Sequence, residues 1–479
     1  MLEASYFCCP CPETSLILIR KLLLIAFVVP ILFSCMHNDV PQSTWIGGEI
    51  VNPTSGYVVF AQGDRVIDTV PLDSNNFFLY NSNDLKEGLY ILRHNETQVF
   101  YLQPGDSLML HLNTVDFDES LAYSGKGSQK NNLLMEYFLV NEQENLNLPS
   151  WYGLSPAEFT KKIDSLRVLK EERYQEFLKD QKEVPSLFEQ TVRAAIDYDY
   201  YMKKELYALA NFSRLSSIDP SFFSYRAQVD TENEALRYYY PYYRYLLYYL
   251  DNLTLKKLAA HGDRFSFDFS NTRLEMIDSL IKNDSIRNTL SRNTALRFYF
   301  NGKEEEALLG KFLAKFQQIN NLPKHNSEVK RVAKTASTMV NGKTIPHIAL
   351  LTTENTSEDL HDLIHKPTVL FFWSYKSPTQ AIKNHNRAAE LKSKFPEYNF
   401  YGINTDNHYR QWRNYVLQEK YNEKEEFQLE NPIDSEHSLL LNNLSKAIII
   451  DKDLKILEGN SNMFHQNFEQ LLLGYLNRR

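Results

Sequence analysis

The spacing of apolar and polar residues changes character twice along the chain and divides it into three regions. From Trp45 to about Ser124 apolar residues alternate with polar ones and many are β-branched or aromatic. This alternation is typical of half-buried strands, and short runs of turn residues separate them. We predict a small antiparallel β-sandwich over residues 45–125, with a small barrel as the alternative. Its strands are expected at 45–51, 57–62, 66–72, 77–80, 89–94, 99–102 and 108–112.

In the second region, residues 126–336, apolar residues recur at helical spacing and Gly and Pro are rare within the segments. That pattern favours amphipathic helices, and we find no repeat of constant period that would indicate a solenoid. The region is predicted to be an all-helical domain, with helices that include 156–181, 186–207, 232–250, 273–282 and 304–320.

One helical stretch, Tyr238–Tyr249, contains eight tyrosines. A tyrosine buries a large ring while its hydroxyl requires a partner or water, so such a helix suits the space between two packed layers. Our first interpretation is therefore a packing seam. The alternative is an exposed groove for sugar rings or a peptide.

In the third region, residues 337–479, short apolar runs alternate with helical patterns. This alternation indicates βαβ units and a partly parallel sheet. Predicted strands are 348–352, 368–373, 399–404, 446–451 and 455–458, and predicted helices are 377–395, 409–420 and 464–477. The fold class predicted for the whole chain is multidomain α+β.

The N-terminus looks like a secretory signal. Arg20 and Lys21 precede a twelve-residue apolar run, Leu22–Phe33, which ends at Ser34-Cys35. Such a run makes a helix of about 18 Å, too short for a ~30 Å hydrocarbon core. The end of the run resembles a bacterial lipobox, which implies cleavage after residue 34, acylation of Cys35 and a tether at 35–44. The alternative is an uncleaved signal anchor.

Cysteine usage and charge then restrict the function. The four cysteines are Cys8, Cys9, Cys11 and Cys35, so the chain after Cys35 has neither a thiol nor a disulfide. The net charge is −8, and we see no long Lys/Arg run. Nucleic-acid binding needs a basic face, so we expect no nucleic-acid partner.

Five segments of the third region occur in an order and at a spacing that can be compared with known families. They are 342–346 (Gly-Lys-Thr-Ile-Pro), 357–360, 367–373 (Pro-Thr-Val-Leu-Phe-Phe-Trp), 401–406 and 448–453. Together they resemble the thioredoxin-like thiol–disulfide oxidoreductases of bacterial envelopes, of the cytochrome-maturation type. The resemblance covers about 140 residues and implies a thioredoxin-like α/β domain.

The chain departs from that family where the family carries its chemistry. In place of Trp-Cys-x-Pro-Cys, the segment after Trp373 reads Ser-Tyr-Lys-Ser-Pro-Thr-Gln. Aligned on Pro378, Lys376 takes the position of the attacking cysteine and Thr379 that of the resolving one. Neither can form a mixed disulfide. Ser445 takes the position of the family's cis-proline. The helix start remains, and Ser377, Pro378 and Gln380 predict a capped N-terminus with an S-x-x-Q capping box.

Other site motifs are sparse. His361 and His365 are four residues apart, which on a helix would place two imidazoles on one face, but the sequence indicates no third metal ligand. We therefore interpret them as surface histidines. The sequence contains no Walker loop, dinucleotide glycine motif or nucleophile elbow. We predict no metal, no cofactor and no catalytic residue.

The order of the segments resembles Gram-negative envelope lipoproteins with a thioredoxin-like domain. That resemblance implies a protein anchored through Cys35 and facing the periplasm from the outer membrane. The expected function is that of a redox-inactive binding or scaffold protein, with an unknown envelope protein or glycan as partner. The alternatives are an oxidoreductase-family enzyme and a glycan-binding lipoprotein that uses exposed aromatic residues.

Overall fold

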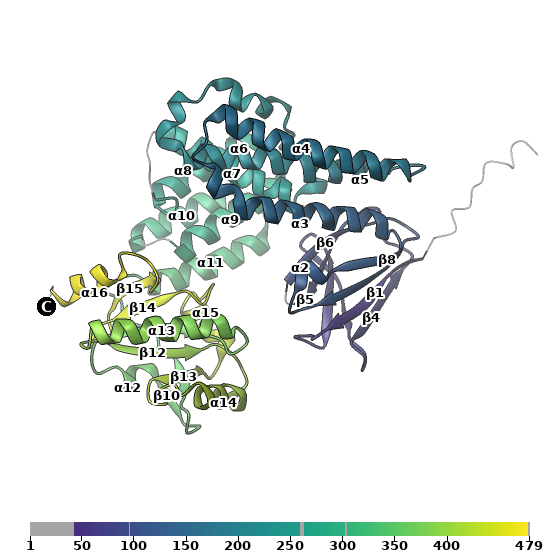
Figure 1. Ribbon diagram of the computed structural model, residues 1–479. Coiled ribbons are helices and arrows are strands. Elements are labelled where there is room, and N and C mark those ends of the chain that lie inside the picture. Colours follow the sequence, from purple (N-terminus) through teal and green to yellow (C-terminus); the bar gives the residue numbers. More distant parts are fainter. Residues whose placement is uncertain (1–42, 95, 259–262, 302–303, 478–479) are drawn as a thin grey trace, which may run out of the picture. The chain divides into compact units, whose positions relative to one another are not determined.

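The computed structural model describes residues 43–94, 96–258, 263–301 and 304–477 (Figure 1). The predicted signal peptide, the acylation site at Cys35 and most of the tether lie outside these ranges. The chain divides into two compact units at the bond between Glu136 and Tyr137. The architecture is mixed α/β, with sheets near both ends of the described chain and helices between them.

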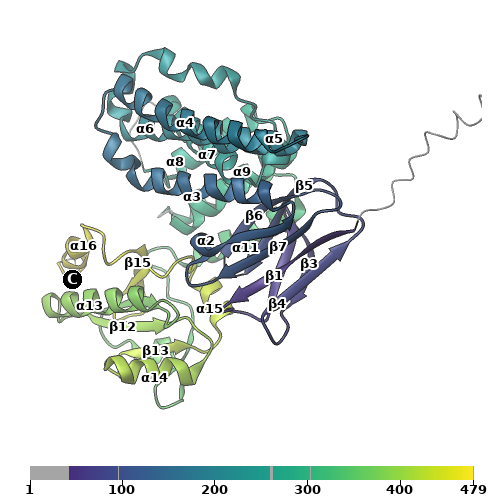
Figure 2. The same ribbon diagram turned by 45° about the vertical axis from the view of Figure 1, so that its right-hand side comes forward.

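The first unit contains two four-stranded sheets, ordered β4-β1-β7-β8 and β3-β2-β5-β6 (Figure 2). All seven predicted strands form. The structure adds β8 and the one-turn helix α2 (Phe117–Ser120). The strands are β1 (Thr44–Val51), β2 (Tyr57–Gln62), β3 (Arg65–Pro71), β4 (Phe77–Ser82), β5 (Gly88–His94), β6 (Glu96–Leu102), β7 (Ser107–Asn113) and β8 (Ala122–Lys126).

The predicted purely antiparallel pairing is wrong for one pair of strands. β1 runs parallel to β7, with Ile46 opposite Leu108 and Ile50 opposite Leu112. These four apolar side chains are fully buried, so the pairing places two apolar rows on the inner face. Close contact between the strands requires Gly48, because a Cβ atom there would lie 2.0 Å from the Leu110 carbonyl oxygen.

The outer face of the β4-β1-β7-β8 sheet carries an apolar patch, which we call the outer apolar face. It consists of Trp45, Phe77 and Leu79, whose exposed fractions are 36%, 43% and 55%. The strand register places Leu79 beside Gly47, so the patch lies over a residue without a side chain. The inner residues of the same strands are buried, which is the pattern of a sheet with one open face.

The second unit begins within α3 and continues through a long run of helices. The predicted helix 186–207 forms as α5, a π-helical turn η1 and α6 in succession, so one extra residue is accommodated in mid-helix. The α-helices are α3 (Ser128–Trp151), α4 (Pro156–Lys179), α5 (Ser186–Arg193), α6 (Asp199–Ala210), α7 (Tyr240–Leu258), α8 (Phe267–Leu280), α9 (Asp284–Asn301), α10 (Glu306–Ile319) and α11 (Pro323–Thr338). The shorter turns are η1 (Ala194–Tyr198), η2 (Phe212–Ser217), η3 (Pro220–Gln228) and η4 (Glu234–Leu236).

The tyrosine-rich stretch packs as a seam. Tyr239, Tyr242 and Tyr245 are buried, and the other five rings are half-buried. Tyr242 lies edge-on to Tyr198 of η1, with ring centroids 5.0 Å apart. The exposed groove proposed as an alternative is therefore not present on α7.

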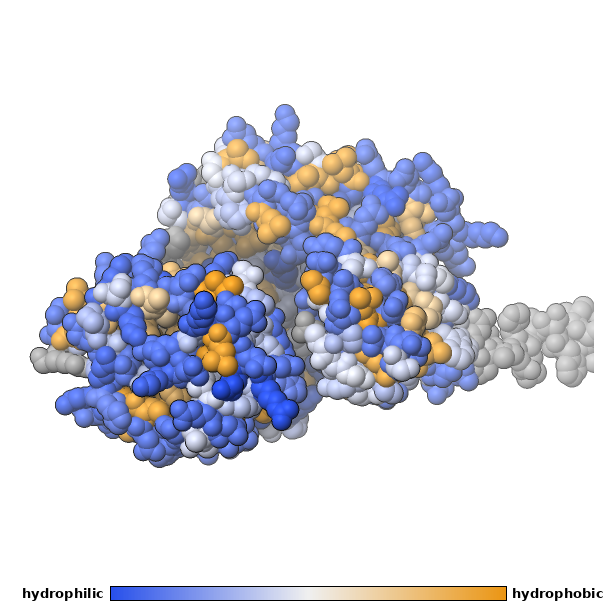
Figure 3. Space-filling view, turned by 60° about the horizontal axis from the view of Figure 1, so that its bottom comes forward, coloured by the Kyte–Doolittle hydropathy of each residue, from blue (hydrophilic) through white to orange (hydrophobic). Residues whose placement is uncertain are grey.

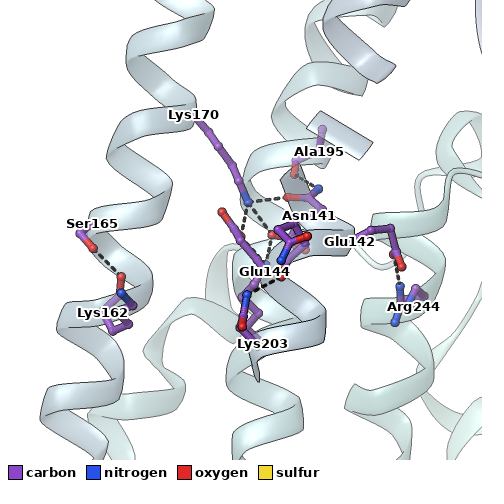
Figure 4. Close-up of polar contacts among 12 residues, drawn as sticks. Asn141, Glu142, Glu144, Lys162, Ser165, Lys170, Ala195, Lys203 and Arg244 are labelled. Carbon is purple, nitrogen blue, oxygen red and sulfur yellow. Dashed lines mark hydrogen bonds and ion pairs between the residues drawn. The ribbon is translucent and has the colours of Figure 1, made fainter. Parts of the chain in front are cut away.

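A cluster of four charged side chains lies inside the helical layer, where α3, α4 and α6 meet (Figure 4). Lys170 donates to Glu144 and to Asp199, at 2.8 Å in each case. Lys203 lies 2.9 Å from Glu144 and also donates to Asp199. Two ammonium groups thus neutralise two carboxylates in the interior. We call these four residues the buried charge cluster.

The C-terminal part of the second unit is built on a seven-stranded sheet, ordered β10-β9-β13-β12-β11-β14-β15. Its strands are β9 (Ala349–Leu351), β10 (Ser357–Asp359), β11 (Thr368–Trp373), β12 (Asn399–Asn404), β13 (Glu426–Leu429), β14 (Ala447–Ile450) and β15 (Ile456–Ser461). Its helices are α12 (Leu360–Leu363), α13 (Pro378–Lys394), α14 (Tyr409–Glu419), α15 (Pro432–Ser438) and α16 (Phe468–Leu476). β11 and β12 are parallel, as the βαβ pattern predicts. β13, which the sequence pattern did not predict, runs parallel to β12.

The helices and the C-terminal sheet share one apolar core. Leu370 and Phe372 on one face of β11 belong to the same cluster as Phe298 and Phe312 of α9 and α10. Val369, Phe371 and Trp373 point to the opposite face, where they join α13, α14 and α16. Both faces of β11 are therefore covered, which explains why all six of its residues are buried.

Among the described residues, no helix has both the length and the apolar character needed to cross a membrane. Hydrophilic residues predominate on the face drawn in Figure 3, and hydrophobic residues form small separate groups.

Candidate functional site

The site that sequence comparison selects is the connection from β11 to α13. In the structure it is a tight turn, in which Ser377 donates its backbone N–H to the Ser374 carbonyl at 3.1 Å. Lys376 and Thr379 are both exposed. We call residues 374–377 the redox-position loop, because the resemblance places the redox cysteines in and beside it.

Asp406 holds this loop in place. Its carboxylate accepts hydrogen bonds from the Ser374 hydroxyl at 2.8 Å and from the Tyr375 backbone N–H at 2.9 Å. The Lys376 ammonium group lies 3.8 Å from the same carboxylate. Ser374 and Asp406 are buried, so hydrogen bonds between buried polar groups hold the loop in place.

Neighbouring parallel strands complete the anchor. Asn404 donates to Asp406 at 3.1 Å, and Gln428 of β13 donates to the Asn404 side chain at 3.1 Å and to the Asp406 carbonyl at 2.9 Å. The register pairs Trp373 with Asn404, so the residues that follow each strand meet at the carboxyl edge of the sheet. Open α/β sheets commonly bind ligands at this edge.

The start of α13 differs from the prediction. Pro378 occupies the first turn as expected, but Ser377 makes no capping hydrogen bond with its side chain. Gln380 donates instead to the Leu444 carbonyl at 3.0 Å, so the predicted capping box does not form. The Ser377 N–H, which a capping box would direct to the Gln380 side-chain oxygen, donates instead to the Ser374 carbonyl.

The same contact brings the aligned positions together. Gln380 follows Thr379, and Leu444 precedes Ser445, so the hydrogen bond joins the two segments that contain these residues. Asn384 supports the arrangement by donating to the same Leu444 carbonyl at 3.2 Å. Ser445 itself is exposed, and every peptide bond among the described residues is trans.

The next residue, Lys446, is buried. Its ammonium group donates to the Leu439 and Leu440 carbonyls at 2.8 and 3.2 Å. Burial lowers the pKa of Lys446 to about 7. The residue also lines a cavity of about 430 Å³ between the helical and α/β segments. Nothing in the sequence pattern distinguished this lysine from a surface one.

Two interacting side chains, His385 and Glu426, lie beside Trp373, the residue that precedes the redox-position loop. His385 of α13 contacts Glu426 of β13 at 3.1 Å through Nε2, and its Nδ1 contacts the Ala381 carbonyl at 2.8 Å. The Trp373 indole donates to the other carboxylate oxygen at 3.0 Å. Burial raises the pKa of Glu426, and His385 and Trp373 oppose that rise. Both ring nitrogens of His385 thus lie beside oxygen atoms, one of the backbone and one of the carboxylate.

Sequence reasoning missed this pair because a glutamate in a fully buried strand carries no local signal. Gly402 of β12 is the matching feature, since a Cβ atom there would lie 2.5 Å from the Glu426 carboxylate. A glycine in a central strand indicates the close approach of another group, but not which group.

The histidine pair of the sequence prediction does not form on a helix. Helix α12 ends at Leu363, so His365 lies beyond it and is exposed. His361 instead contacts His347, with ring centroids 3.9 Å apart and the rings tilted by 31°.

The sequence matches no family model and no curated protein. Similar solved structures include the thioredoxin domain of a thiol-disulfide oxidoreductase from Bacteroides vulgatus, with 17% identity and a TM-score of 0.24 over 29% of this chain and 96% of that one. Another is a thiol:disulfide interchange protein from a Bacteroides species, with 17% identity and a TM-score of 0.24 over 29% of this chain and 90% of that one. A third is a conserved protein of unknown function from Bacteroides fragilis, with 13% identity and a TM-score of 0.23 over 28% of this chain and 98% of that one.

The chemistry open to the redox-position loop follows from its groups. Thiol–disulfide exchange requires a thiolate that attacks a disulfide sulfur, and the loop has none. The Ser374 hydroxyl donates to Asp406 and accepts from the Lys376 backbone N–H at 3.1 Å, so its hydrogen bonds maintain the turn. The loop is a fixed surface with an exposed lysine.

Proposed function

We propose that this protein is a lipid-anchored envelope protein whose thioredoxin-like C-terminal domain binds a partner without redox chemistry. The observation that carries the proposal is the redox-position loop. Lys376 takes the attacking position, and the turn is anchored by Asp406 and strand-end amides. The chain after Cys35 contains no cysteine, so it supplies neither an attacking nor a resolving thiol.

The electrostatics of the loop support the same conclusion. A helix N-terminus stabilises negative charge and lowers a thiol pKa, which is how the fold activates cysteine. Lys376 precedes α13 and carries the opposite charge. Asp406, 3.8 Å away, compensates that charge. The role we assign to this turn is to present a binding surface of defined shape.

We predict that purified protein lacking residues 1–35 has no insulin-reducing and no disulfide-isomerase activity. A mixed disulfide needs a protein thiol, and the chain after Cys35 contains no cysteine. Turnover should equal a buffer blank in a standard insulin turbidity assay, with a thioredoxin as positive control. Turnover above the blank that survives Lys376→Ala and Thr379→Ala would contradict the proposed function.

The second part of the proposal is the anchor at Cys35. We predict that Cys35→Ala abolishes metabolic labelling with a fatty-acid analogue and moves the protein from the membrane fraction to the soluble one. The physical reason is that the apolar run 22–33 is too short to span the membrane once the acyl chains are absent. Ser34→Ala keeps a small residue before the cysteine and is the matched control. Labelling that persists in Cys35→Ala would exclude the lipobox.

A glycan-binding role remains the second candidate, and one observation favours it. The outer apolar face presents Trp45 and Phe77 on an open sheet, which suits the stacking of sugar rings. Co-purification from envelopes with the wild type, Trp45→Ala and Lys376→Glu separates the two candidates. Loss of a protein partner only in Lys376→Glu supports the scaffold role, whereas loss of a glycan only in Trp45→Ala supports the glycan role.

A further inference from the structure

Two histidines and an aspartate meet at the edge of the C-terminal sheet, and the backbone places them there. β9 and β10 are antiparallel, with Ala349 opposite Asp359. The pairing continues by one residue, because the Leu360 N–H donates to the Ile348 carbonyl at 2.9 Å. His347 and His361 therefore lie opposite each other across the two segments. Side chains at such positions are close enough to interact.

The side chains converge. The His347 Nδ1 lies 3.1 Å from an Asp359 carboxylate oxygen, and the centroids of the two imidazole rings, tilted by 31°, are 3.9 Å apart. One ligand atom of each residue lies within 4.8 Å of those of the other two. Of the three, His347 is the most exposed, with 77% of its side chain accessible. The cluster is open to small solutes.

The hydrogen bonds around His361 resemble those around metal-bound histidines. Its Nε2 lies 2.7 Å from the Ile345 carbonyl oxygen, which can only accept, so Nε2 is the donor of this contact and Nδ1 is the nitrogen that can face a metal. A histidine that binds a metal usually donates its other N–H to a carbonyl or carboxylate. Asp359 is fixed as well, because it accepts the His361 backbone N–H at 2.9 Å and so caps α12.

We propose that His347, Asp359 and His361 form a binding site for a divalent transition-metal ion of the zinc class. Two imidazoles and one carboxylate are the donor set that zinc and its neighbours prefer, whereas calcium and magnesium prefer oxygen donors. Three protein ligands leave at least one coordination position open to solvent or to a partner.

The movement required is small. Ligand atoms around a tetrahedral zinc ion, with bonds of 2.0–2.1 Å, lie about 3.4 Å apart. Closing from within 4.8 Å to that spacing needs a rotation of the exposed His347 ring and no change in strand register. Asp359 can continue to cap α12 because a carboxylate has two oxygens and several lone pairs.

The experiment is titration of the protein lacking residues 1–35 with Zn²⁺ by calorimetry, repeated with Co²⁺ to record the visible spectrum of the bound ion. The expected result is one site per chain that His347→Ala weakens at least tenfold, with loss of the cobalt spectrum. Asp359→Asn should weaken it as well, while asparagine preserves the helix cap.

His365→Ala is the matched control, because it removes an exposed histidine four residues from His361 without touching the cluster. It should leave affinity and spectrum unchanged. Circular dichroism of each variant verifies the fold. Zinc affinity that is unchanged in both His347→Ala and Asp359→Asn would overturn the proposal, as would an equal loss in His365→Ala. Neither result depends on whether the protein is acylated or redox-inactive.

Discussion

Replacing Lys203 with methionine should lower the free energy of unfolding of the second unit by about 3–5 kcal/mol. Lys203 and Lys170 together balance Glu144 and Asp199 inside the helical layer. Removing one ammonium group leaves an uncompensated negative charge in a place that excludes water. Urea unfolding of the protein lacking residues 1–35, followed by circular dichroism, measures the shift of the transition.

The matched control is Lys161→Met on α4. Lys161 is exposed, so the same loss of charge should change the free energy of unfolding by less than about 0.5 kcal/mol. Equal effects of the two substitutions would mean that the buried charge cluster has no special energetic role.

The same cluster sets a pH dependence. Burial alone would raise the pKa of Asp199, but Lys203 and Lys170 hold it below its ordinary value of 3.8. Asp199 therefore contributes stability above pH 3.8 that is lost as pH falls through the lowered value. Burial alone would lower the pKa of Lys170, but Asp199 and Glu144 hold it above 10.5. That contribution is complete below pH 10.5 and is lost as pH rises through the raised value.

Tyr242→Ala should lower the free energy of unfolding of the second unit by about 3 kcal/mol or more. Tyr242 is fully buried, and its hydroxyl accepts the Asn233 backbone N–H at 3.1 Å. The truncation removes a ring packed against Tyr198 and leaves a cavity in the seam. Thermal and urea unfolding both report the loss.

Tyr242→Phe separates the ring from the hydroxyl. It keeps the packing and removes one hydrogen bond, so its cost should be about 0.5–1.5 kcal/mol. If Tyr242→Ala and Tyr242→Phe cost the same, the ring contributes little and the packing-seam interpretation is wrong.

The strands that the sequence predicts most accurately are those whose pattern is purely apolar or cleanly alternating. β11 and β12 begin and end at the predicted residues, because continuous apolar runs between turn residues leave few alternatives. β13 was missed because its sequence, Glu-Phe-Gln-Leu, looks polar. Glu426 and Gln428 are nevertheless buried, because other residues form hydrogen bonds with their polar groups. His385 and Trp373 contact the Glu426 carboxylate. Gln428 donates to the Asn404 side chain and to the Asp406 carbonyl.

The candidate site, too, could be predicted from the sequence only in part. The contact between the segments that contain Thr379 and Ser445 is made by Gln380 and Leu444, and no local pattern in the sequence identifies that pair. The role of Asp406 could have been predicted from parallel strands that end at a common edge. The cluster of His347 with His361 could not, because it depends on the register between two short strands that no local pattern specifies.

The shared core also bears on modularity. The apolar residues Leu370 and Phe372 of the C-terminal sheet are covered by helices that precede it in the chain, including Phe298 and Phe312. A fragment that begins near residue 337 would expose that face to water and tend to associate through it. The C-terminal α/β segment therefore needs the preceding helices to cover one face of its sheet. Recombination or truncation that preserves solubility has to carry α9–α11 along with the sheet.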